Sequence, residues 1–293
     1  MALPFDYIQS LRDEISKKQQ HEIYMLYKSA YRTLLRYKEG KLNNTRLTQT
    51  QIDLLLDQTR AAMNDVAKGE YDVAYSGIEA IASATGRLIR PSDISFTARV
   101  VKSIVTGSVY GPSRTWSLSS AIWGDSNRKM RDIYSIVARG MILGESTEQI
   151  ADKLLKYVNP DKAFYWTGPG SLRIYSHKVD YNAQRLVRTL TTHAYQKAVV
   201  DATYNDPALI GYRWYANGSR ACPICQDRNG TVYGKDDVPW DHPNGMCYIE
   251  PVYGPKRVSY DDIIEWASSE DGKYPSMDEF MKPYLDRVTS KNL

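Results

Sequence analysis

All three cysteines of this chain lie in one short part of the sequence, and a histidine lies among them. Cys222 and Cys225 are separated by two residues, and His242 and Cys247 follow in a second segment. Two thiols at this spacing can hold one ion from a tight turn, and a histidine and a cysteine can complete the site from elsewhere. Three thiolates and one imidazole are a common ligand set for four-coordinate structural zinc. The sequence therefore predicts a zinc site formed by Cys222, Cys225, His242 and Cys247.

Other roles for these thiols stay open at this stage. They can remain reduced without metal, or Cys222 and Cys225 can form a redox pair. An odd number of cysteines argues against a disulfide framework, and no βαβ pattern surrounds the pair as redox chemistry would favour. Catalytic zinc keeps one coordination position open, whereas four protein ligands fill it. The pattern therefore favours a structural metal over a reaction centre.

The composition is that of an ordinary globular chain of 293 residues, with 42% hydrophobic and 25% charged residues. A formal net charge of +4 does not indicate binding of nucleic acid by the whole molecule. No run approaches the roughly 18 apolar residues of a membrane span, and the first residues do not resemble a signal peptide. We therefore expect no membrane contact and synthesis in a reducing cytoplasm. The 23 tyrosines against 4 phenylalanines fit an interface-rich protein or compositional drift equally well.

The first part of the chain is predicted to be helical, because apolar residues recur at three- and four-residue spacing. Ser146 and Gln149 form a capping-box pattern, which marks a helix start. The expected helices cover residues 6–38, 48–85, 92–109, 125–143, 146–157 and 181–204. We therefore expect a helical region over 1–160, and an irregular connector over 161–180 that contains Gly168-Pro169-Gly170.

After Asp206 the pattern changes to short extended segments at 209–216, 231–233 and 248–253, separated by turn residues. A region of about 50 residues seldom buries enough apolar surface to be stable alone. A structural zinc can supply about 10–16 kcal/mol of apparent folding free energy in such a case. The expected fold is therefore α+β and mostly α-helical. Its second domain, 181–293, contains a Cys/His module at 205–255 and ends in short helices that begin near Ser259 and Ser276.

A series of motifs follows in one order in the second half of the chain: Arg188-Thr189, Ala194-Tyr195-Gln196-Lys197-Ala198, residues 211–218, Cys222-Pro223-Ile224-Cys225, residues 229–233 and His242-Pro243-Asn244…Cys247. That order resembles the Mu F-like minor head proteins of tailed bacteriophages. The likeness covers roughly residues 115–255, while residues 1–110 share only a helical character. That family usually has a cysteine where Gly245 stands and a glutamate where Leu190 stands. His242 is therefore needed for a tetrahedral site, with Asp241 as an alternative oxygen ligand.

This resemblance implies a protein of the phage head and not an enzyme. Such a protein would be present at low copy number inside the capsid near the portal vertex, after assembly in the host cytoplasm. It would take part in head assembly, DNA packaging or DNA ejection. Its expected partner is the portal protein, with the major capsid or scaffolding protein and weak, non-specific contact with packaged DNA as further partners. The helices within residues 1–110 are the candidate portal-binding surface.

Two other functions are weighed against this expectation. A zinc deaminase needs His-x-Glu followed by Pro-Cys-x-x-Cys, but here the proline lies inside the cysteine pair and no His-x-Glu precedes it. Asp241-His242 suggests a nuclease, but no second histidine and asparagine follow at suitable spacing. A non-specific DNA-binding module would rely on short basic clusters at 87–90, 128–131 and 185–188, which on helices are more often solvated. His193 is expected to be a packed residue and not a ligand.

Overall fold

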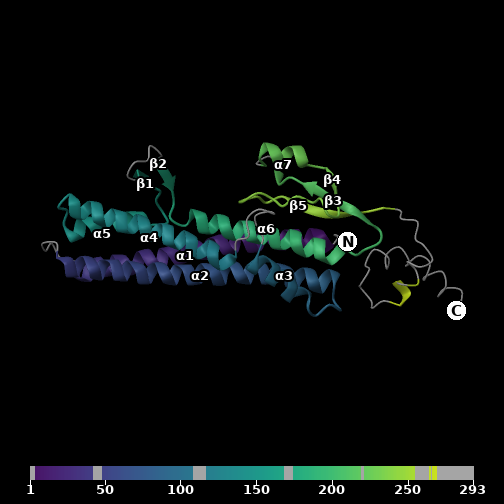
Figure 1. The fold of residues 1–293 in the computed structure, drawn as a ribbon, viewed down its shortest axis with the longest axis horizontal. Helices are drawn as coiled ribbons and strands as arrows, with labels where there is room; N and C mark the ends of the chain where they lie inside the picture. Colours follow the sequence, from purple (N-terminus) through teal and green to yellow (C-terminus); the bar gives the residue numbers. More distant parts are fainter. Residues whose placement is uncertain are drawn as a thin grey trace. The chain divides into compact units, whose positions relative to one another are not determined.

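The computed structural model describes residues 4–41, 48–107, 117–167, 174–218, 221–254, 264 and 266–268 (Figure 1). Its helices are α1 (Pro4–Lys41), α2 (Gln49–Ile89), α3 (Phe96–Thr106), α4 (Leu118–Ile142), α5 (Thr147–Val158), α6 (Tyr181–Thr203) and α7 (Pro223–Arg228). Its strands are β1 (Phe164–Thr167), β2 (Ile174–His177), β3 (Leu209–Tyr215), β4 (Val232–Gly234) and β5 (Tyr248–Tyr253). The expected α+β, mostly α-helical fold is confirmed. No helix in the described part of the chain is both long and apolar enough to cross a membrane.

The three strands predicted after Asp206 form one antiparallel sheet in the order β4-β3-β5. Tyr212 of the central strand pairs with Tyr233 of β4, and Trp214 pairs with Ile249 of β5. At Gly211 an added Cβ would lie 2.0 Å from the backbone oxygen of Tyr233, so only glycine fits this part of β3. The short helix α7, which the sequence analysis did not predict, lies between β3 and β4 in the chain.

The expected connector differs from the observed structure. Residues 164–167 and 174–177 form an antiparallel hairpin, with Phe164 paired to His177. The expectation of irregular structure is wrong for these eight residues, whose aromatic and β-branched character suits strands. Gly168-Pro169-Gly170 and the helix expected from Ser276 lie outside the described residues. Of the helix expected from Ser259, the described residues 264, 266 and 267 are helical.

The chain divides into two compact units, each assembled from separate stretches. Unit 1 comprises Met1–Ser16, Ser76–Thr115 and Arg188–Leu293, and unit 2 comprises Lys17–Tyr75 and Trp116–Val187. The helices α1, α2 and α6 therefore each contribute residues to both units. The sequence pattern carried no sign of this interleaving.

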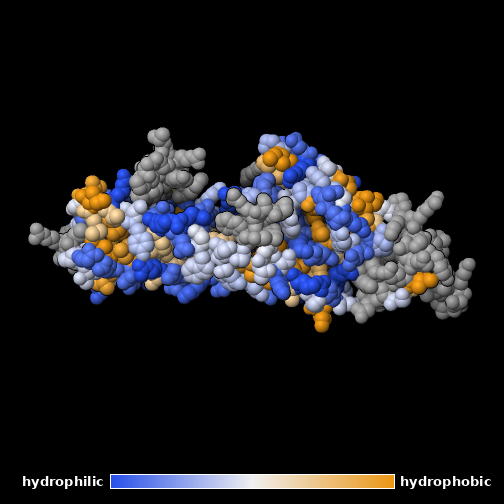
Figure 2. All heavy atoms as spheres, in the orientation of Figure 1, coloured by the Kyte–Doolittle hydropathy of each residue, from blue (hydrophilic) through white to orange (hydrophobic). Residues whose placement is uncertain are grey.

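Unit 2 is built from helices that bury aliphatic side chains. Helix α5 begins with the predicted capping box, because Ser146 accepts from the backbone of Gln149 while the Gln149 side chain accepts from the backbone of Ser146. Gly144, at a φ of 70°, makes the corner between α4 and α5. Figure 2 shows an apolar patch at this corner, where Met141, Ile142 and Leu143 are exposed. The buried core of unit 2 includes Ile23, Leu34, Leu55, Met63, Val66, Ile122, Ile133, Val137, Ile150 and Leu154.

Unit 2 also buries a cluster of ionisable side chains. The hydroxyl of Tyr27 donates to Glu70 at 2.5 Å, and Lys129 donates to the same hydroxyl. The Lys129 ammonium lies 2.5 Å from Asp125 and 3.7 Å from Glu70. Burial raises the pKa of Glu70, whereas Lys129 and Arg128 lower that of Asp125 despite its burial. Lys129 thus serves both buried carboxylates, and the half-exposed Arg128 also pairs with Asp125 at 3.0 Å.

Unit 1 packs the sheet against the second part of α6. The Tyr195 hydroxyl donates to the backbone oxygen of Ile249 on β5 at 2.9 Å, and the hydroxyls of Thr203 and Tyr212 lie 2.9 Å apart. Tyr195, Tyr212 and Trp214 are fully buried. These aromatic residues fix the sheet on the helix and so determine where the Cys/His module lies.

Candidate metal centre

The four predicted ligands come from two segments of unit 1. Cys222 is the N-cap residue of α7, Pro223 occupies the first helical turn, and Cys225 lies one turn inside the helix. Proline suits this position because its missing N–H would have no partner inside the helix. His242 and Cys247 lie in the loop between β4 and β5, which we call the ligand loop (residues 241–247). The short helix α7 therefore presents the thiols of Cys222 and Cys225 toward the ligand loop, which carries the His242 imidazole and the Cys247 thiol.

The candidate ligand atoms form two overlapping groups that share Cys225. One consists of Cys222, Cys225 and His242, the other of Cys225, Asp241 and Cys247, and the ligand atoms within each group all lie within 4.8 Å of one another. The sulfur of Cys222 is 3.3 Å from Nε2 of His242. A tetrahedral zinc with ordinary bond lengths spaces neighbouring ligand atoms by about 3.5–3.8 Å. The four predicted residues therefore lie close together and could hold a metal ion.

The imidazole of His242 is oriented for ligation through Nε2. Its Nδ1 lies 3.1 Å from the backbone oxygen of Pro243, a distance at which an Nδ1–H donates to that oxygen. In the neutral ring, this tautomer leaves the lone pair on Nε2, which faces Cys222. Metal-bound histidines usually donate their second ring N–H in this way.

The electrostatics of the three thiols differ. The backbone N–H of Cys225 hydrogen bonds to Cys222 and lowers the pKa of that thiol, and His242 acts in the same direction. Burial raises the pKa of the thiols of Cys225 and Cys247. A buried thiolate needs a nearby cation, which a bound metal ion supplies. A metal ion bound here would therefore matter most for ionisation of the buried thiols of Cys225 and Cys247.

Asp241 organises the ligand loop from within. Its buried carboxylate accepts the backbone N–H of His242 at 2.9 Å through Oδ1 and that of Cys247 at 2.9 Å through Oδ2. A Cβ atom at Gly245 would lie 2.2–2.3 Å from the same carboxylate. The Asp241 carboxylate therefore occupies the space that a side chain at position 245 would need, which explains why glycine stands there.

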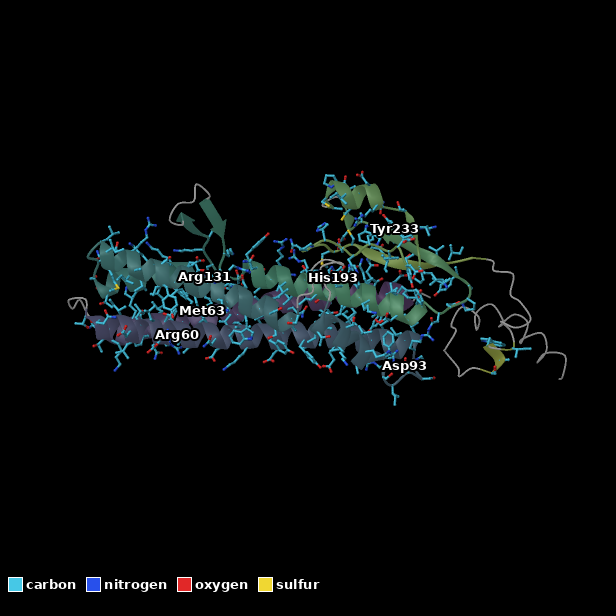
Figure 3. The ribbon with its side chains drawn as sticks, viewed as in Figure 1. Arg60, Met63, Asp93, Arg131, His193 and Tyr233 are labelled. Carbon is cyan, nitrogen blue, oxygen red and sulfur yellow. The ribbon has the colours of Figure 1, made fainter. Side chains whose placement is uncertain are left out.

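Successive turns of α6 hold the ligand loop from outside. Arg188 donates to the side-chain oxygen of Asn244 at 2.7 Å, and the Thr189 hydroxyl accepts the Asn244 N–H at 2.8 Å. One turn later, Thr192 donates to the oxygen of Gly245, and Nε2 of His193 lies 2.8 Å from the oxygen of Asp241. A further turn on, Gln196 accepts the N–H of Asp241 at 3.1 Å. His193, labelled in Figure 3, is thus buried and packed against the ligand loop, as predicted, and lies outside the two candidate metal groups.

Arg12 of α1 is a site residue that the sequence analysis missed. Its guanidinium donates to the backbone oxygens of Met246 and Cys247 at 3.2 and 3.0 Å, and it lies 5.2 Å from the centre of the Tyr195 ring. The side chain is fully buried. A signal was present in the sequence, because polar residues occupy the buried stripe of α1. That stripe runs through Ile8, Arg12, Ser16, Gln19 and Ile23.

The basic clusters considered for DNA binding are partly engaged inside the protein. Arg90 donates to the oxygen of Ala202 at 2.7 Å, Lys129 is buried in unit 2, and Arg188 holds Asn244 in unit 1. Each of these cations has a structural role, which leaves fewer charges for phosphate contact.

The described residues thus place the four predicted ligands close together, in two overlapping groups that could hold a metal ion. Within the described residues, the two groups around Cys225 are the clusters of histidine, cysteine and acidic residues that could hold a metal. Comparison with protein-family models, curated proteins and solved structures finds no match for this chain.

Proposed function

We propose that this chain is a minor head protein of a tailed bacteriophage, associated with the portal and packaged inside the head at low copy number. The observation that supports this proposal is that the separate motifs resembling that family contact one another in one module. Arg188 and Thr189 bind Asn244, and Gln196 binds Asp241 beside His242. Short motifs that are similar by chance have no reason to converge in this way.

We also propose that the metal is zinc and that Cys222, Cys225, His242 and Cys247 hold it. Thiolates with one imidazole suit zinc, and zinc would bring only structural stability to a closed site. Cys222 and Cys225 would fix α7 to the ligand loop, while Asp241, Arg12 and α6 hold that loop in place. Elemental analysis of freshly purified protein should give one zinc per chain. No stoichiometric zinc, with β3 and β5 still protected from proteolysis, would contradict this assignment.

A role without catalysis is part of the proposal. The nucleic-acid enzymes that use zinc need a free coordination position for water and a nearby general base. Here the ligands fill the positions, and both oxygens of Asp241 accept backbone N–H groups. The site therefore favours a structural module over a nuclease or a deaminase.

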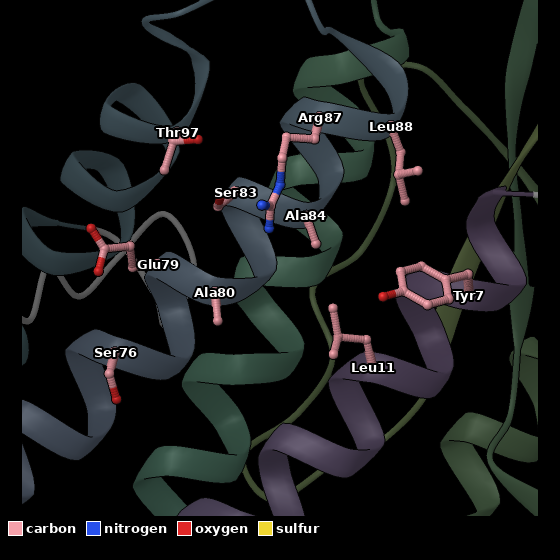
Figure 4. Close-up of a pocket in the computed structure, with 10 residues that line it drawn as sticks. All are labelled: Tyr7, Leu11, Ser76, Glu79, Ala80, Ser83, Ala84, Arg87, Leu88 and Thr97. Atoms are coloured by element: carbon pink, nitrogen blue, oxygen red, sulfur yellow. The ribbon is translucent and has the colours of Figure 1, made fainter.

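The portal contact is assigned to a groove of about 740 Å³ within unit 1, in the N-terminal helices that we expected to bind the portal. Tyr7 and Leu11 of α1 lie on one side and Leu88 of α2 lies near them (Figure 4). Tyr7 is 58% exposed and Leu88 is 45% exposed. Exposed aromatic and aliphatic groups beside an arginine, here Arg87, are typical of residues that dominate protein interfaces.

The test is co-purification of the full chain with the portal protein of the same phage. Leu88→Asp should weaken this association at least about tenfold, because a carboxylate would enter an apolar contact. The matched control is Leu54→Asp, since Leu54 lies on the same helix, is 50% exposed and does not line the groove. Equal loss in both variants would remove the groove from the proposal. Absence of the chain from mature particles would contradict the proposed function itself.

A further inference from the structure

We propose that a second groove of unit 1, beside Trp240, binds a peptide segment of a partner protein through its backbone carbonyl. This groove has a volume of about 680 Å³. The end of α6 lines one side and the segment 235–240, which leads into the ligand loop, lines another. The inference does not depend on the identity of the metal or on the proposed place of the protein in a phage head.

Gln196 provides the first argument, because it places a buried donor at this groove. Its Oε1 accepts the N–H of Asp241 at 3.1 Å, which fixes the orientation of the amide group. Nε2 must then face elsewhere, and it is a buried donor without a hydrogen-bond partner among the described residues. Buried donors in native proteins are nearly always satisfied. The side chain lines the groove, so a ligand that supplies an oxygen acceptor would satisfy it.

Trp240 provides the second argument, because it offers a fixed apolar surface. Its ring centre lies 5.2 Å from that of the buried His193, and the side chain is still 36% exposed. Val200, Val238 and Pro239 extend the apolar lining. A tryptophan held in place on one face is well suited to contact a side chain of a bound peptide on the other.

The charges at the groove decide between a peptide and a phosphate-bearing ligand. Lys197 pairs with Asp201 at 2.5 Å, and Lys235 donates to the backbone oxygens of Tyr204 and Asp206. Asp236 accepts from the Tyr204 hydroxyl at 2.7 Å. Arg99, which also lines the groove, pairs with Asp93 at 2.6 Å. Each cation of the lining is thus engaged with an acceptor of the protein, and no concentrated positive charge attracts phosphate. A neutral backbone carbonyl with an apolar side chain is the ligand that this lining favours.

The experiment uses the full chain with its metal and a blocked tripeptide, N-acetyl-glycyl-tyrosyl-glycinamide, as the probe. Side-chain amide signals of Gln196 and the indole N–H signal of Trp240 are followed by NMR during titration. We expect saturable shifts of both signals, with the Gln196 N–H moving downfield as it donates to the peptide. Adenosine monophosphate at the same concentrations should shift neither signal.

The decisive variant is Gln196→Glu, which keeps an acceptor for the N–H of Asp241 but replaces the free donor by an acceptor. Affinity for the tripeptide should fall at least tenfold. The matched control is Gln58→Glu, the same change at an exposed position of α2, which should bind as the wild type does. Trp240→Leu, which keeps Gln196 intact, should also weaken binding and provides a second test if Gln196→Glu fails to fold.

Three results would overturn the proposal. The first is equal affinity of wild type and a folded Gln196→Glu variant for the tripeptide. The second is the absence of any shift at Gln196 and Trp240 up to the solubility limit of the probe. The third is saturable binding of adenosine monophosphate with larger shifts than the peptide produces, which would assign the groove to a nucleotide.

Discussion

Unit 2 buries an ammonium group between two carboxylates, whereas unit 1 gathers thiols, an imidazole and a carboxylate around one centre. In unit 2 the charges of Glu70 and Asp125 are balanced by Lys129, and Arg128 also pairs with Asp125. In unit 1, burial opposes ionisation of Cys225 and Cys247, and a metal ion is the cation that would allow it. The two units thus accommodate buried ionisable side chains in different ways. Unit 2 carries its own counter-ions, while the buried thiols of unit 1 would need a metal ion from solution to ionise.

Removal of metal should have the largest effect and should separate the two units. Structural zinc contributes about 10–16 kcal/mol of apparent folding free energy in small modules. After chelation, hydrogen exchange should show loss of protection in β3 and β5, while α4 and α5 keep theirs. Adding zinc back should restore the protection. Unchanged protection in the sheet of a demonstrably metal-free protein would remove the contrast between the units.

Removal of the internal cation should be the next largest effect, and it should affect unit 2. Lys129→Met removes the cation nearest to both Glu70 and Asp125 and leaves Asp125 with only the half-exposed Arg128; removing one partner of a buried ion pair costs about 3–5 kcal/mol. Urea unfolding would measure the loss. The control is Lys68→Met, because the Lys68–Asp65 pair is 69% and 79% exposed and should contribute less than about 1 kcal/mol. Equal effects of the two variants would show that the buried cluster is not specially dependent on its cation.

Gly245→Ala should weaken the metal site without changing a ligand. The added Cβ would collide with the Asp241 carboxylate and displace it from the N–H groups of His242 and Cys247. Loss of such supporting contacts typically lowers metal affinity about 10–100-fold, which a competition titration with a zinc chelator would measure. The control is Gly124→Ala, where nothing lies within 4 Å of the added atom. Wild-type affinity in Gly245→Ala would show that the Asp241 contacts do not support the site.

The smallest expected effect concerns an exposed ion pair at the start of α3. Hydrogen bonds from Arg99 and Ser95 lower the pKa of Asp93 to about 2. A lowered acid pKa stabilises the fold above the unfolded value of about 4, and this contribution is lost as the pH falls toward 2. It should stay below about 1 kcal/mol because both side chains are partly exposed. In Arg99→Gln, NMR titration of Asp93 should give a pKa closer to 4, and an unchanged value would contradict the assigned cause.

The elements that could be predicted from the sequence are those determined by residues close together in the chain. The Ser146–Gln149 capping box needs only residues three apart, and the strands of the Cys/His module follow from turn residues beside β-branched and aromatic runs. The four candidate ligands were visible because the cysteines gather in one short stretch. The role of Arg12 was not visible, since only the folded chain brings it to Cys247, and the supporting role of Asp241 depends on how the ligand loop turns. The α7 helix was missed because six residues are too few to show a helical period.

The contact between Arg12 and the backbone of Cys247 joins residues separated by 235 positions in the chain. During synthesis, all stretches of unit 2 have been made once Val187 is complete, whereas unit 1 still lacks its sheet and its ligand loop. Domains fold as their sequences become available, so unit 2 can form on the ribosome first. Arg12 of α1 can contact Cys247 only after that residue has been synthesised. A metal ion held by the candidate ligands would bind only after Cys247 has emerged. Within the described residues, the candidate metal centre is thus completed after unit 2.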